Sequence, residues 1–156
     1  MQGFFHKQGF TTIEALLALC ILVLVTRLVY SSFSVFRNRQ FLETNTRNVV
    51  SLIEEARSLT LSSRGGSSFG VHFDSDRAVR FSGLVYSSGS ASNVVAKLDV
   101  PVTLSLINIT GGGSDVVFNK IKGTTDTSGT LELSLVASSS IKKIITVRST
   151  GIVDVQ

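Results

Sequence analysis

Few residues in this chain are of the types that carry out chemistry, and they are scattered. The 156 residues include two His and one Cys, too few for a structural zinc site built from four such ligands. His72 lies between apolar Val71 and Phe73 in a strand-like stretch and faces away from them, so we expect an ordinary strand residue. The other His, His6, lies in the leader at 1–9, so the head offers no second His for a catalytic triad or a Cys–His pair. The sequence therefore predicts no enzyme, no metal site and no cofactor.

Two loops have spacings that resemble ligand-binding motifs. Asp74 and Asp76 are spaced like two calcium ligands, but the loop lacks the other acidic positions, so a solvated turn is expected. The glycine run at 111–113, followed by Ser114, lacks the Lys-Ser/Thr of a phosphate-binding loop and predicts a turn.

The most informative segment lies near the N-terminus, where residues 13–25 are all apolar except Glu14. Residues 10–26 would form about 26 Å of helix, near the lower limit for crossing a bilayer. A leader at 1–9 carries His6 and Lys7, which favours the cytoplasmic side for that end. A carboxylate inside such a segment costs about 2.5–3.5 kcal/mol on insertion scales, so Glu14 needs a partner.

Three ordinary interpretations fit this segment poorly. A cleaved secretory signal would end at a small-residue site, and no such site follows Val25. A lipoprotein signal would place a small residue before the modified Cys, but Leu19 precedes Cys20. A plain N-terminal anchor leaves Glu14 unexplained.

The string K-Q-G-F-T-T-I-E at residues 7–14, followed by the apolar run, resembles the class III signal of type IV pilins and pseudopilins. The resemblance implies that a prepilin peptidase cuts after Gly9 and methylates the new N-terminal Phe10. It also implies that Glu14 pairs with the α-amine of a neighbouring subunit and sets the register between helices during assembly. The chain departs from many family members in having no Pro in the apolar run and in carrying Arg27.

A single long helix is expected from about residue 12 to residue 63, because no Pro or Gly interrupts this stretch. Beyond residue 40 its apolar residues recur at steps of three, four and seven, which indicates one buried face. The glycines at 65–66 supply a stop. We divide the chain into a leader at 1–9, a transmembrane and assembly helix at 10–36, an amphipathic spine helix at 37–64 and a β-rich head at 65–156.

The head is expected to be an antiparallel β-sandwich, giving an α+β fold in which the long N-terminal helix packs on it. Alternation is clearest at 102–106 and 131–135, and turn signals include 127–129 and the serines at 138–140. Strands are expected at 69–73, 78–82, 94–98, 102–109, 115–121, 130–136, 142–147 and 152–155.

Looser motifs in the spine and head are similar to those of GspH/FimT-type minor pseudopilins, among them F-G-V-H-F at 69–73 and G-T-T-D-T-S-G-T-L at 123–131. The resemblance implies a non-enzymatic minor subunit of a type IV pilus or a type II secretion pseudopilus. Its partners would be the prepilin peptidase, other pilin or pseudopilin subunits and the inner membrane. The protein would span that membrane once, with its head on the periplasmic side, before joining the filament.

The alternative function is DNA binding during natural transformation, through basic residues of the head. Lys142, Lys143 and Arg148 are the candidate contacts, since some FimT-like pilins bind DNA through basic residues close to the C-terminus. Here Gly151 is followed by Ile152 where that motif has an Arg. The net charge of +4 is too diffuse to require a nucleic-acid partner.

Overall fold

A computed structural model describes residues 11–62 and 66–156, apart from the side chains of 28–32 and 34. The chain divides into two compact units, Met1–Arg37 and Asn38–Gln156. Gly9 and Phe10, the expected cleavage position, lie outside the described residues.

One helix, α1 (Thr12–Leu61), accounts for all the described α-helix, in agreement with the uninterrupted stretch expected from the sequence. Its first turn is capped by Thr11, whose hydroxyl oxygen accepts a hydrogen bond from the Glu14 backbone N–H at 3.3 Å. The helix ends at Leu61, two residues before the expected position.

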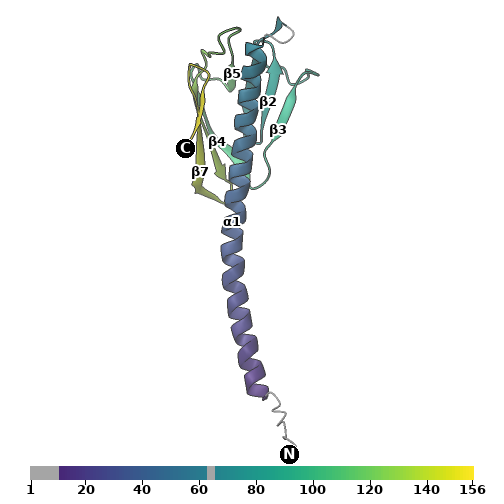
Figure 1. Cartoon of the computed structure of the whole chain (residues 1–156), viewed down its shortest axis with the longest axis vertical. Coiled ribbons are helices and arrows are strands. Elements are labelled where there is room, and N and C mark those ends of the chain that lie inside the picture. The colour runs from purple at the N-terminus through teal and green to yellow at the C-terminus, as the bar shows by residue number, and fades with distance from the viewer. Residues whose placement is uncertain (1–10, 63–65) are drawn as a thin grey trace, which may run out of the picture. The chain divides into compact units, whose positions relative to one another are not determined.

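Within the described residues, the head has eight strands in two antiparallel sheets. Figure 1 shows the strands as arrows. The first sheet has the order β3-β2-β1-β5 and the second the order β4-β6-β7-β8. In chain order the strands are β1 (Phe69–Asp74), β2 (Arg77–Ser82), β3 (Val94–Lys97), β4 (Val102–Ile109), β5 (Asp115–Val117), β6 (Gly129–Leu135), β7 (Ser138–Val147) and β8 (Val153–Val155).

Two expectations for the strand boundaries of the head are wrong. Strand β5 ends at Val117 instead of residue 121, and Phe118 makes only an isolated bridge to Thr125. The serines expected to form a turn begin strand β7, because the chain reverses earlier, at residues 136–137. A register shift between Ser134 and Leu135 lets Leu135 pair with Ser138 across this tight turn.

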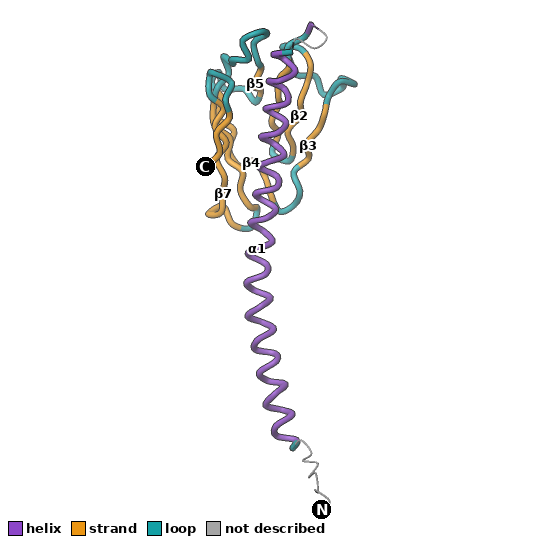
Figure 2. The backbone as a smooth tube through the Cα atoms, viewed as in Figure 1, coloured by secondary structure: helices purple, strands orange, loops and turns teal. Residues whose placement is uncertain are grey.

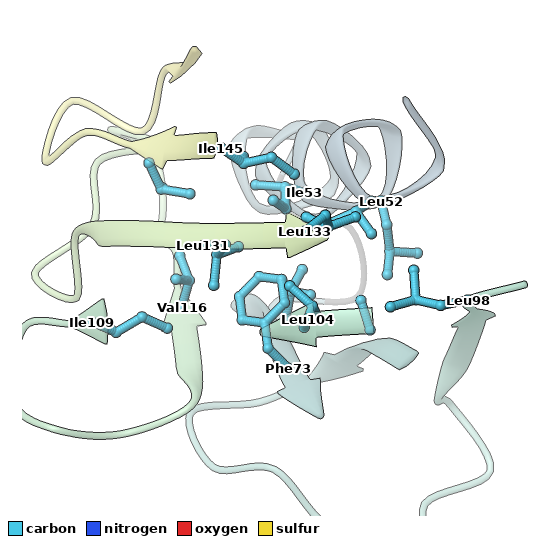
Figure 3. Close-up of a cluster of buried hydrophobic side chains, with 14 of the residues drawn as sticks. Leu52, Ile53, Phe73, Leu98, Leu104, Ile109, Val116, Leu131, Leu133 and Ile145 are labelled. Carbon is cyan, nitrogen blue, oxygen red and sulfur yellow. The ribbon is translucent and has the colours of Figure 1, made fainter. Parts of the chain in front are cut away.

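The core is one hydrophobic cluster shared by the C-terminal part of α1 and both sheets (Figure 3). Leu52 and Ile53 of α1 point toward Leu133 and Ile145 of the second sheet. Leu42, Val49 and Ala56 are buried as well, so the apolar stripe read from the sequence is the buried face of the helix. Phe73 and Val116 contribute from the first sheet, and Phe118 contributes from the position directly after β5.

Hydrogen bonds also fix α1 to the head at three positions along the helix. The Asn45 side-chain oxygen accepts a hydrogen bond from the Asp99 N–H at 2.9 Å. The Arg57 guanidinium donates to the Gly123 carbonyl at 3.0 Å. The Thr60 hydroxyl accepts from the Phe69 N–H at 2.9 Å. These contacts hold the part of α1 from Asn45 to Thr60 as a fixed element of the head.

Candidate functional site

The candidate assembly site is the first half of α1, around Glu14. Nine large apolar side chains between Ile13 and Val25 are 49–70% exposed, and they occupy every side of the helix. The Glu14 side chain is exposed too and makes no hydrogen bond or ion pair with any described residue. The hydrogen bond to Thr11 comes from the Glu14 backbone N–H. A carboxylate in this setting is available to a group outside the chain.

Thr11 is a residue of this site that the sequence analysis missed. The spacing T-x-x-E at 11–14 is a helix N-terminal signature, in which a hydroxyl caps the N–H three residues later. Because the capping bond uses the Glu14 backbone, the Glu14 carboxylate is not consumed by it. Among the residues that the structure describes, no helix has a stretch both long and apolar enough to cross a membrane.

The three candidate DNA contacts are all carried by the second sheet or its edge, but two of them are paired. Lys142 donates to the Glu132 carboxylate at 3.0 Å, and Arg148 donates to Asp154 at 2.5 Å. Of the three, Lys143 alone makes no ion pair or hydrogen bond through its side chain within residues 11–62 and 66–156. Pairing reduces the charge that Lys142 and Arg148 present to a phosphate backbone.

Glu132 shows the electrostatic consequence of this pairing. The hydrogen bond from Lys142 holds the pKa of the Glu132 carboxyl below its ordinary value, and a second hydrogen bond from the Ser105 hydroxyl acts in the same direction.

His72 has partners that no local pattern indicated. Strands β1 and β5 place it opposite Asp115, and its Nδ1 lies 2.5 Å from the Asp115 carboxylate. Its Nε2 lies 3.5 Å from Asp74, and Tyr86 stacks on the ring at a centroid distance of 4.0 Å. With both ring nitrogens facing carboxylates, neither faces a nucleophile. The cluster ties β1, β5 and the loop after β2 together.

The turn at Asp74 is crossed by an ion pair. Asp74 accepts a hydrogen bond from the Arg77 guanidinium at 3.0 Å. In the described part of the chain, no group of three or more His, Cys, Asp or Glu side chains is arranged to hold a metal ion.

Comparisons with known proteins bear on the fold. No protein-family model matches the chain, and no curated protein sequence does. Two crystal structures of the type IV minor pilin FimU from Pseudomonas aeruginosa are similar to it. One gives a TM-score of 0.58 at 13% sequence identity and covers 78% of this chain and 92% of FimU. The other gives 0.57 at 13% identity and covers 74% and 92%. At this identity the likeness concerns the fold, and the chain has the α+β fold of a type IV minor pilin.

Proposed function

We propose that this protein is a minor pilin or pseudopilin. It is made as a prepilin, cut after Gly9 by a prepilin peptidase, methylated at Phe10 and anchored in the inner membrane through residues 10–36, with the head on the periplasmic side. From there it joins other subunits in a type IV pilus or a type II secretion pseudopilus. The likeness of its fold to a type IV minor pilin supports this proposal. The role is structural, and its only chemistry is as a substrate of the peptidase.

The observation that carries the proposal is the exposed apolar half of α1 with Glu14 at its start. Large apolar side chains on every side of a helix need cover, and both a bilayer and a bundle of like helices supply it. In either setting an isolated carboxylate is costly, so Glu14 requires a cation. Cleavage after Gly9 would create one, because a methylated α-amine at Phe10 stays protonated near neutral pH.

We assign the Glu14 carboxylate to the amine of a neighbouring subunit, as the resemblance to type IV pilins implies. No described residue of this chain pairs with the carboxylate, and the Thr11 cap uses only the Glu14 backbone N–H. A cation–carboxylate pair is strong in a low-dielectric environment. It would therefore fix the axial register between two helices whose other contacts are apolar and non-directional.

The test is the substitution Glu14→Ala, with Glu54→Ala as the matched control. Glu54 is an exposed carboxylate on the same helix and makes no ion pair among the described residues. We expect Glu14→Ala to leave membrane insertion intact and to reduce incorporation into sheared filaments by at least about tenfold, the effect of about 1.4 kcal/mol. Glu54→Ala should incorporate normally. Normal incorporation of Glu14→Ala would contradict the register argument.

A further inference from the structure

We propose that one end of the head docks on an anionic lipid surface. This basal end consists of residues 39–47 of α1, the β3–β4 loop at 98–101, the β6–β7 turn at 136–137 and the start of β7 at 138–143. The inference rests on the membrane anchoring proposed above and adds a second membrane contact, made by the head itself.

Two aliphatic side chains project from the basal end. Val100 is 86% exposed and Val136 is 71% exposed. Their loops are joined, because the Val136 N–H donates to the Pro101 carbonyl at 2.8 Å. The bond from the Asp99 N–H to Asn45 fixes the same loops beside α1, at one end of the head (Figure 2). The two valines therefore lie on adjacent tips of the same surface.

Two basic residues without partners among the described residues line a groove at the basal end. The groove has a volume of about 410 Å³ and lies between α1 and β7, over an apolar floor of Leu42 and Ile141. Arg39 and Lys143 line it and make no ion pair or hydrogen bond with any described residue.

The other charges of the basal end are mostly compensated. Glu43 pairs with Arg47 at 3.2 Å, and Lys142 pairs with Glu132 at 3.0 Å. The groove therefore presents net positive charge at Arg39 and Lys143, because Glu43, the acid that lines it, is paired with Arg47. Asp99 lies in the β3–β4 loop of the same basal end and is an exposed, unpaired acid among the described residues, so it opposes the two open cations.

Exposed aliphatic tips beside uncompensated cations fit the boundary between lipid headgroups and acyl chains. A soluble anion would engage the cations and leave the valines in water. The chain also tethers this surface: only Arg37 and Asn38 separate Arg39 from residue 36, where the proposed anchor ends. Each basic side chain near an anionic membrane contributes roughly 1 kcal/mol, about fivefold in the ratio of docked to free heads.

The experiment uses the full chain with Cys20→Ser and an environment-sensitive fluorophore on Val136→Cys. It is reconstituted in phosphatidylcholine vesicles with or without phosphatidylglycerol. We expect a blue shift and quenching by membrane-bound quenchers, larger with phosphatidylglycerol and reversed by salt. The control is Leu84→Cys, which is 72% exposed in the loop after β2, where the Gly83 N–H bonds to Ser68 near the other end of α1. Its probe should report water in both vesicles.

Charge-reversal variants test whether Arg39 and Lys143 drive the docking. Arg39→Glu with Lys143→Glu should lower the docked-to-free ratio by at least about 25-fold, two fivefold steps. Lys122→Glu is the matched control, because Lys122 is exposed next to Gly123, which lies against Leu61 at the C-terminal end of α1. Asp99→Asn should increase docking, and added inorganic phosphate should produce no blue shift.

The outcomes separate the two proposals. If the protein floats with vesicles but the Val136 probe reports water in both, head docking is wrong and the anchored pilin stands. Burial of Val136 only in filaments would also contradict lipid docking and would assign this end to a contact between subunits. If the protein fails to float, both the anchor and the docking surface are wrong.

Discussion

Among the described glycines, Gly151 leaves the least room for a side chain. It is buried with φ of +79°, a conformation that disfavours residues with a Cβ. An added Cβ would lie 1.9 Å from the Gly123 carbonyl oxygen and 2.8 Å from the Arg57 guanidinium. That carbonyl is the acceptor for Arg57, so Gly151 keeps room for a bond that ties α1 to the head.

We predict that Gly151→Ala lowers the free energy of unfolding by at least about 2–3 kcal/mol, since it adds a backbone clash to the conformational penalty. Gly112→Ala is the control: its φ is +73°, and an added Cβ meets nothing within 4 Å. It should cost only about 1–2 kcal/mol, the conformational part. Denaturant unfolding of the full chain in detergent measures both, and equal losses would show that the contact with Gly123 is not restrictive.

The pairing of Glu132 predicts how the stability of the protein depends on pH. Because the pKa of Glu132 is lowered in the folded state, its pairing with Lys142 stabilises the protein at neutral pH, and this stabilisation is lost as the pH falls through the lowered pKa. Glu132→Gln should therefore lower the Tm at pH 7. The difference from the parent protein should vanish well below the ordinary Glu pKa of about 4.3. A Tm difference that is the same at both pH values would contradict the assignment.

At the scale of elements, the sequence predicted the strands of the head better than the turns that connect them. The long helix and the eight strands follow from hydrophobic periodicity, which depends on which face each residue buries. The turn at residues 136–137 does not follow from this periodicity. A bulge between Ser134 and Leu135 sets the register there, so the serines at 138–140 lie in strand β7. Such a shift depends on pairing between strands, which no short window of sequence contains.

The same distinction applies to the candidate sites: local sequence identifies single residues, but contacts between distant residues require the fold. Glu14 was singled out from local sequence alone, because a carboxylate in an apolar run is conspicuous. The contact between His72 and Asp115 joins residues 43 positions apart, and only the pairing of β1 with β5 brings them together. The capping role of Thr11 was readable from its spacing to Glu14. Ion pairing of Lys142 and Arg148 was not, since it requires the positions of Glu132 and Asp154.

The buried stripe of α1 makes a quantitative prediction at this scale. Ile53 is 0% exposed in the shared core, whereas Leu61 at the end of the same helix is 41% exposed. Ile53→Ala should cost about 2–5 kcal/mol of unfolding free energy, and Leu61→Ala less, because a smaller part of the Leu61 side chain leaves water on folding. Comparable losses measured by denaturant unfolding would contradict the role of the stripe as the packing face of α1.

At the scale of the whole molecule, the two compact units have different surfaces. The unit Asn38–Gln156 buries its own core, while the described apolar side chains of Met1–Arg37 are exposed. Large uncovered apolar surfaces are typical of contacts with lipid or with other chains. The first unit therefore carries the surface that the proposed assembly would use, and the second unit is the folded head.

The central claim is that the chain becomes competent for assembly only when a new N-terminus is made at Phe10. The most direct measurement is mass spectrometry of the intact protein and its N-terminal peptide, purified from cells that contain active prepilin peptidase. We predict a mature chain that begins at Phe10 and carries an N-methyl group, with Gly9→Val as a control that stays uncut. Recovery of the parent chain with residues 1–9 still attached would contradict the account.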